Sequence, residues 1–227
     1  MNFISILSTL VTFIFAYKVF QRYQLKGGMH QLLWAFGLLL YGLGTLSEVI
    51  LGFTFNAMVL KLWYLTGAML TAAWLGQGSI HLLIRKGKWA LYLTYILSGV
   101  SLLALILVAI APLTGSQLNY NVAATASEQY KTILTRSGLI IFLTIILNIY
   151  GTLGLVGGAG YSAFLFWRKK VLAGRMFGNL FIAIGALSPA MAGTFVKAGL
   201  VDALYISEFI GAVLMFIGFL WSTSGKE

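Results

Sequence analysis

Long runs of apolar residues recur along this chain of 227 residues, and short polar segments separate them. Crossing about 30 Å of hydrocarbon takes roughly 20 helical residues, and seven runs reach that length. Each run is too long and too continuous for a strand, so the pattern predicts an all-α bundle of seven transmembrane helices. The predicted spans are Phe3–Tyr23, His30–Gly52, Leu60–Ile84, Trp89–Leu113, Ser137–Trp167, Arg175–Ala198 and Asp202–Ser222.

The composition points to the same class of protein. Hydrophobic residues make up 60% of the chain and charged residues 9%, whereas soluble domains are about 45–50% apolar and about 25% charged. A chain of this size has too little interior to bury so many apolar side chains, so the bilayer is its solvent. We expect an integral membrane protein, in a membrane of the bacterial plasma membrane type.

The Lys and Arg residues are distributed unevenly between the two sides of the predicted bundle. Loops on one side hold ten of them, and loops on the other side hold Lys61, Lys131, Arg136 and Lys197. Because cytoplasmic loops carry the excess of Lys and Arg, we place the N-terminus outside and the C-terminus in the cytoplasm. The net charge of +10 is then mainly an orientation signal with contact to anionic lipid head groups, and we expect no nucleic acid partner.

The second and sixth spans share a sequence pattern. Residues Gly37–Leu46 (GLLLYGLGTL) match Gly178–Leu187 (GNLFIAIGAL) at a constant offset of 141 positions. The pattern predicts a single membrane domain with two parallel three-helix units, 1–84 and 137–227, joined by a linker helix, 85–113, and an outer loop, 114–136. The matched positions are Gly37 and Gly178, Gly44 and Gly185, Leu46 and Leu187, Ser47 and Ser188, and Tyr64 and Tyr205.

This layout of three helices, one helix and three helices resembles the sugar-facilitator and PQ-loop family, and in topology the microbial rhodopsins. The PQ-loop family carries a Pro-Gln pair in each half, whereas neither Pro112 nor Pro189 is followed by Gln. The rhodopsins bind retinal through a lysine in their seventh helix, and Asp202–Ser222 contains none. The resemblance therefore concerns architecture and does not assign a function.

Two acids lie well inside predicted spans, where an ionisable residue is costly and marks a candidate functional site. Glu48 lies near the outer end of the second span, and Glu208 lies about six residues into the seventh, so both reach a similar depth. Helical spacing places Glu48 on one stripe with Tyr41 and Gly44. We predict a ligand-binding pocket formed by Glu48, Tyr64, Asn148, Ser188, Tyr205 and Glu208.

Two interpretations of these acids stay open. They line a pocket for proton exchange or for a cationic or hydroxyl-rich ligand, or they pair with Lys61 and Lys197 and lock the outer end of the bundle. The polar loop 114–136 is either a solvated connection or a lid over the outer face. The tryptophans and tyrosines near span ends are expected in the interfacial aromatic belt, namely Trp63, Trp89, Trp167, Trp221, Tyr23, Tyr92 and Tyr205.

The supply of reactive side chains is small. The chain has no cysteine, two histidines and five acids, so we expect no enzyme, no metal site and no cofactor. The expected partners are the bilayer, a small solute or proton as substrate, and another membrane protein or a second copy of the chain. We predict a carrier or binding protein with an outward-facing pocket; the alternatives are a sensory protein acting through a partner and an accessory subunit of a larger membrane complex.

Overall fold

The computed structural model describes residues 3–84, 87–114, 120–122, 124–169, 173–197 and 201–223. Over these ranges the chain forms eight helices and no strand, two of the helices being interrupted by π-helical segments. The helices are α1 (Phe3–Lys26), α2 (Met29–Leu51), α3 (Ala57–Trp63) continued by η1 (Tyr64–Leu70) and α4 (Thr71–Leu83), α5 (Trp89–Ile110), α6 (Ala126–Ile133), α7 (Gly138–Thr152) continued by η3 (Leu153–Gly157) and α8 (Gly158–Lys169), α9 (Ala173–Lys197) and α10 (Val201–Thr223).

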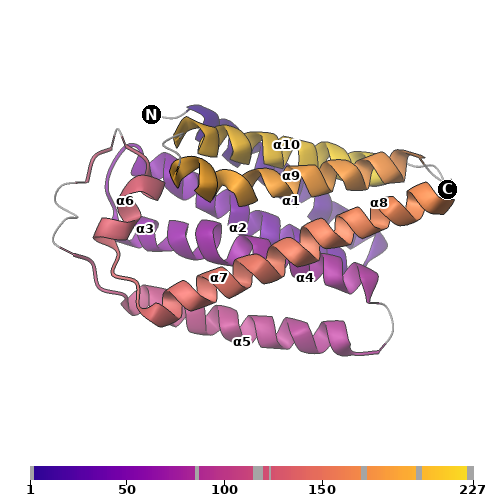
Figure 1. Ribbon diagram of the computed structural model, residues 1–227, viewed down its shortest axis with the longest axis horizontal. Helices are drawn as coiled ribbons and strands as arrows, with labels where there is room; N and C mark the ends of the chain where they lie inside the picture. The colour runs from indigo at the N-terminus through magenta and orange to yellow at the C-terminus, as the bar shows by residue number, and fades with distance from the viewer. Residues whose placement is uncertain are drawn as a thin grey trace.

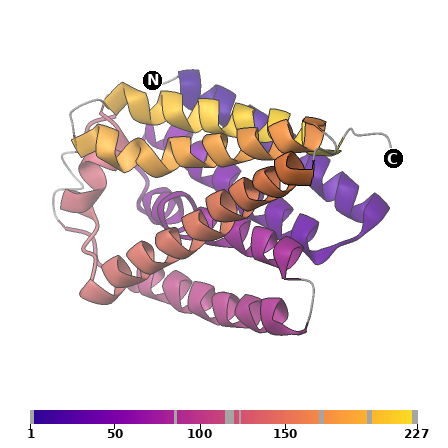
Figure 2. The ribbon, with the colours of Figure 1, turned by 45° about the vertical axis from the view of Figure 1, so that its right-hand side comes forward.

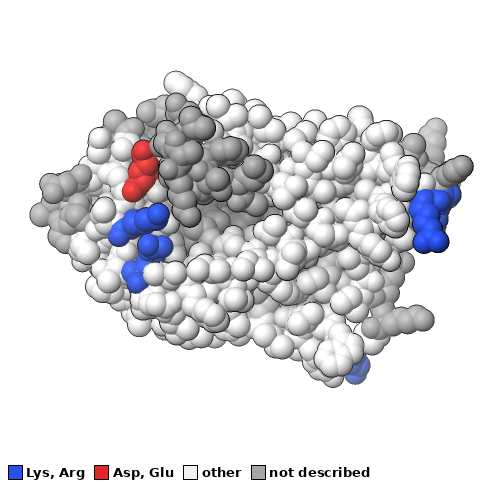
Figure 3. Space-filling view, viewed as in Figure 1, with Lys and Arg blue, Asp and Glu red and all other residues white. Residues whose placement is uncertain are grey.

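Six helices of the described chain are long and apolar enough to cross a membrane, which suggests an integral membrane protein. They are Phe3–Lys26, Met29–Leu51, Ala57–Leu83, Trp89–Ile110, Gly138–Lys169 and Ala203–Thr223. The predicted span Arg175–Ala198 falls on α9, which packs along α10 (Figure 1). On the face drawn in Figure 3, the described Lys, Arg, Asp and Glu side chains gather toward the two ends of the molecule, and the described residues visible between them are uncharged.

The helices form one bundle whose two ends differ. At one end, here the α6 end, α2 passes into α3 and the short helix α6 lies over the bundle (Figure 1). At the opposite end, Gly27 and Gly28 adopt positive φ where α1 turns into α2, and Gly87, also with positive φ, precedes α5. The N-terminus lies at the α6 end and the C-terminus at the opposite end (Figure 1).

Close backbone contacts between small residues hold the long helices together. A Cβ atom built on Gly151 of α7 would lie 2.1 Å from the Ala72 carbonyl carbon of α4. One on Gly44 of α2 would lie 2.8 Å from the Gly67 Cα. In lipid, such close approach replaces the hydrophobic effect as the source of helix association.

Helix α7–α8 crosses the bundle diagonally (Figures 1 and 2). Its α8 end packs against α9, and its α7 end diverges from α9 toward the α6 end, where it approaches α4 and η1. Helix α5 lies at the edge of the bundle (Figure 1). The divergence of α7 from α9 leaves the space in which the candidate site lies.

Candidate functional site

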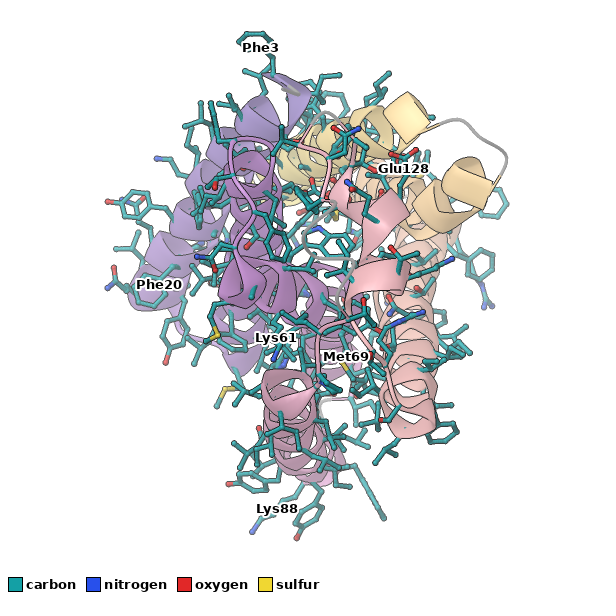
Figure 4. All side chains as sticks on the ribbon, turned by 90° about the vertical axis from the view of Figure 1, so that its left-hand side faces the viewer. Phe3, Phe20, Lys61, Met69, Lys88 and Glu128 are labelled. Atoms are coloured by element: carbon teal, nitrogen blue, oxygen red, sulfur yellow. The ribbon has the colours of Figure 1, made fainter. Side chains whose placement is uncertain are left out.

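A cavity of about 440 Å³ lies inside the bundle toward the α6 end. Its described wall comes from α2, the helix α3–η1–α4, α7 with η3, α9 and α10, while α6 covers it. Figure 4 views the molecule from this end and shows α6 above the centre of the bundle, with Glu128 on it. Lys131 of α6 lines the cavity and is also exposed, so the cavity reaches the surface beside α6.

Glu48 and Glu208 lie on the wall of this cavity and interact electrostatically with each other. Trp63 Nε1 donates a hydrogen bond of 2.9 Å to Glu48 Oε1. The second carboxyl oxygen of each acid, Oε2, is buried and has no hydrogen-bond partner. Two carboxylates close together repel each other, so a shared proton or a bound cation would stabilise the pair.

The lysines proposed as partners of the acids do not form that lock where the structure describes them. The Lys61 ammonium donates a hydrogen bond of 2.7 Å to the Ala109 carbonyl of α5, and Figure 4 shows Lys61 above that helix. The side chain of Lys197 lies outside the described residues. Lys61 is therefore not the ion-pair partner of Glu48.

Hydrogen bonds fix the helices that carry the acids. The Tyr41 hydroxyl of α2 donates a hydrogen bond of 2.9 Å to the backbone carbonyl of Glu208, which connects α2 to α10. Pro189 of α9 also lines the cavity, and it leaves the Gly185 carbonyl without a helical N–H partner. That carbonyl faces Gly211 of α10 in a close contact between the two helices.

The π-helical segment η1 exposes backbone carbonyls that side chains satisfy. Asn148 Nδ2 donates to the Ala68 carbonyl and to the Thr144 carbonyl, both at 2.8 Å. The Thr71 hydroxyl donates a hydrogen bond of 2.8 Å to the Thr66 carbonyl. Asn148 thus clamps α7 to η1, and only its side-chain oxygen is left to accept a hydrogen bond from a ligand. Short π-helical segments in membrane and soluble helices are frequent at functional sites.

The cover helix α6 is built as a defined element. Thr125 caps its first turn, and Thr125 and Glu128 form a capping box. The Tyr130 ring packs against Trp63 at a centroid distance of 5.3 Å, and the Arg136 guanidinium lies 4.8 Å from the Tyr130 ring centroid. Burial raises the pKa of Tyr130, outweighing the opposing effect of Arg136, so its hydroxyl keeps its proton at neutral pH.

The six predicted site residues divide into two groups. Glu48, Asn148 and Glu208 lie on the cavity wall, and Tyr64, Ser188 and Tyr205 are not among its lining residues. The Tyr64 hydroxyl instead shares a hydrogen bond of 2.9 Å with Thr144 of α7. Tyr205 is buried beside Thr125 and interacts electrostatically with both acids. The ligand-binding role of all six stays a prediction.

The prediction that Trp63 and Tyr205 belong to the interfacial belt is wrong, because they are only 6% and 5% exposed. Trp89, Trp167, Trp221 and Tyr92 are exposed near helix ends, as a belt requires. Sequence reasoning also missed the hydroxyl groups of α1, the lining residues of α6 and the bond from Tyr41. The signal available for α1 was the helical spacing of Ser5, Ser8 and Thr12.

The part of the chain that the structure describes contains no group of three His, Cys, Asp or Glu residues able to hold a metal. His81 Nε2 lies 2.7 Å from the Thr94 hydroxyl, in a hydrogen bond.

No known protein family, no curated protein and no solved structure matches this chain significantly. The resemblance to PQ-loop proteins and rhodopsins therefore stays a prediction about topology, and function has to be argued from the site itself.

Proposed function

We propose that this protein is a seven-helix carrier for a small cationic or hydroxyl-rich solute, which it binds in the cavity between Glu48 and Glu208. The observation that carries the proposal is a pair of acids, Glu48 buried and Glu208 half-buried, on the wall of a cavity of about 440 Å³, each with a buried Oε2 that has no hydrogen-bond partner. A volume of this size holds a small organic solute. The acids supply negative charge, and Trp63, Tyr130 and Tyr41 bring aromatic rings that attract a cation.

An apolar seal at the far end of the cavity supports transport rather than simple surface binding. Leu75, Leu155 and Met215 line the cavity, and the same three residues line a small apolar void beneath it with Phe15 and Leu38. The site is thus connected to the α6 end and closed toward the opposite end. Alternating access requires a conformation of this kind, open on one side only.

The course of the chain supports a seventh crossing by α9. The N-terminus and the end of α10 lie at opposite ends of the bundle (Figure 1), which an even number of crossings does not produce. Helix α9 has 25 residues, enough to cross about 30 Å of hydrocarbon. We orient the α6 end outward, because fewer Lys and Arg residues lie there, and we assign the protein to a plasma membrane of bacterial type.

Matched glycine contacts support the two-unit arrangement. Cβ atoms on Gly37 and Gly44 of α2 would lie within 3 Å of the following helix, α3–η1–α4. Cβ atoms on Gly178 and Gly185 of α9 would lie equally close to its own following helix, α10. Each unit then contributes one acid to the site, so a rocking motion of one unit against the other changes the separation of the acids.

Solute-induced currents in proteoliposomes test the proposal. Purified protein is reconstituted and challenged with a panel of small amines, amino acids and sugars between pH 5 and 8. We expect a pH-dependent current for at least one of these solute classes, and its loss in the Glu48→Gln/Glu208→Gln double variant. Glu128→Gln, which removes an exposed acid of α6, serves as the matched control. An unchanged current in the double variant would end the carrier proposal.

A further inference from the structure

One face of α1 carries a row of buried hydroxyl groups behind the acid pair. Ser5, Ser8 and Thr12 follow one another at helical spacing, and all three are at least 97% buried. The hydroxyl oxygens of Ser8 and Thr12 have no hydrogen-bond partner. The Ser5 hydroxyl lies beside the Glu48 carboxyl and interacts with it.

These hydroxyls differ from other buried hydroxyls in the bundle. Thr9 donates to the Ser5 carbonyl, Ser47 to the Leu43 carbonyl and Thr144 to the Ile140 carbonyl, each one helical turn back. Ser8 and Thr12 have a carbonyl in the same position and do not use it. Their hydroxyls are therefore buried polar groups that their own helix does not satisfy.

The row is polar toward the α6 end and apolar toward the opposite end. Helices α1 and α10 run parallel, since Ile4 packs on Leu204 and Tyr205 while the Phe15 ring stacks on the Phe216 ring at 5.0 Å. Phe15 and Val19 continue the same face of α1 after Thr12, and both are buried. The row of hydroxyls thus leads from Glu48 to the middle of the bundle, where Phe15 closes it.

We propose that Ser5, Ser8 and Thr12 form a proton track that connects Glu48 with the Phe15 closure, so that the proton is the coupling ion of the proposed carrier. This inference rests on the proposed function, whose acid pair it supplies with protons. In the proposed track, waters that bridge neighbouring hydroxyls would complete the row, since each hydroxyl can accept one hydrogen bond and donate another. A proton that moves along this row leaves each hydroxyl protonated as before, because each hydroxyl gains one proton and passes one on.

The geometry favours a proton over a bound metal cation. Ser5 and Thr12 are seven residues apart, about 10 Å along the helix axis. A hard cation such as Ca²⁺ holds its oxygen ligands within about 2.6 Å, so one ion cannot contact both hydroxyls. The titratable and charged groups around Glu48 are Glu208 and Tyr205 of α10, Tyr41 of α2 and Tyr120 of the loop before α6, and Tyr130 and Lys131 of α6 line the same cavity. None of them lies on α1, so the hydroxyls are the polar groups that α1 brings to the acid.

Opening the closure tests the track without any solute. Phe15→Ala protein is reconstituted in vesicles containing a pH-sensitive dye, and a potassium diffusion potential drives proton entry. We expect proton influx roughly tenfold above wild type, as for an opened proton relay. Adding Ser8→Ala and Thr12→Val should return the influx to the wild-type level. Adding Ser47→Ala, which removes a buried but partnered hydroxyl, should leave the influx of the Phe15→Ala protein unchanged.

Three results would overturn the track: no influx in Phe15→Ala, influx that survives the Ser8 and Thr12 changes, or a sodium flux of equal size seen with a sodium-sensitive dye. Val19→Ala serves as a second opened variant if Phe15→Ala does not fold. Because the assay needs no solute, a proton leak together with absent solute currents refutes the carrier alone. Solute currents that depend on the acids, without a leak, refute the track alone.

Discussion

The polar clusters around Gln77 and around Glu48 both lie inside this apolar bundle. They differ in whether their polar side-chain atoms have hydrogen-bond partners. Around Gln77, which is fully buried, every side-chain polar atom has a partner: Nε2 donates to the Ala90 carbonyl and to the Thr94 hydroxyl, and Tyr150 donates to Oε1. Around Glu48, one carboxyl oxygen accepts a hydrogen bond from the Trp63 indole, and the other has no hydrogen-bond donor, although Glu208 and Ser5 lie beside the carboxyl.

On the proposed function, this difference distinguishes a structural cluster from a ligand-binding one. A satisfied buried network joins its helices, here α4, α5 and α7, and has no free group to offer a ligand. A buried carboxyl oxygen without a partner costs free energy in the resting protein. We interpret that cost as the consequence of keeping the site free for a proton or solute.

The largest effect is expected at the crossing that lies between the two clusters. Gly151→Ala places a Cβ 2.1 Å from the Ala72 backbone and forces α7 away from α4, which disrupts both Gln77 and the cavity. We expect the loss of at least about 3 kcal/mol of stability and poor recovery of folded protein. Gly157→Ala, on the same helix with open space around it, is the control and should unfold at the wild-type temperature.

Next in size is the loss of the satisfied network. Gln77→Leu removes three hydrogen bonds and should lower the free energy of unfolding by about 2 kcal/mol, at about 0.6 kcal/mol for each bond in a membrane protein. Solute currents per folded molecule should stay at the wild-type level. Thermal unfolding in detergent and current measurements on the same preparation check both statements. A selective loss of current with unchanged stability would reverse the roles assigned to the two clusters.

The acid pair should respond in the opposite direction. Glu48→Gln/Glu208→Gln removes two ionisable groups from the bundle interior, so we expect stability to rise by about 1 kcal/mol while solute currents disappear. Thermal unfolding at pH 7 measures the first part. A fall in stability as large as that of Gln77→Leu would make the acids structural.

The smallest effect concerns the single hydrogen bond to Glu48. Trp63→Phe removes it and keeps the ring contact with Tyr130, so we expect a loss of about 0.6 kcal/mol. Trp89→Phe, which changes an exposed tryptophan, should have no measurable effect. Equal unfolding temperatures for both variants would show that the bond contributes nothing to stability.

The sequence predicts the helices well because the bilayer imposes their length and apolarity. The predicted span Trp89–Leu113, for example, ends within three residues of the end of α5 at Ile110. The similar depth of Glu48 and Glu208 follows from the rise of 1.5 Å per helical residue. Contacts that depend on rotation around a helix axis could not be predicted in the same way. The π-helical segment η1 shifts the residues that follow it around the helix axis, so α-helical spacing cannot be extended across it. Which of two adjacent residues faces the acid depends on the rotation of the helix: Trp63 donates to Glu48, whereas Tyr64 bonds Thr144.

Loop 114–136 shows a second limit. Its polar composition fits both a solvated connection and a lid, and only the structure reveals that Ala126–Ile133 is a capped helix over the cavity. The α1 hydroxyls were overlooked because Ser and Thr in membrane helices usually bond their own backbone. Which hydroxyls lack this bond to their own backbone depends on the packing of neighbouring helices.

Cysteine accessibility measures the difference between the clusters most directly, since the chain has no cysteine of its own. Thr152 lines the cavity, and Thr94 belongs to the Gln77 cluster. In sealed vesicles, a membrane-impermeant thiol reagent applied to the α6 side should label Thr152→Cys and not Thr94→Cys. Labelling of Thr94→Cys alone, or of neither variant, would contradict a water-accessible acidic cavity open at that end.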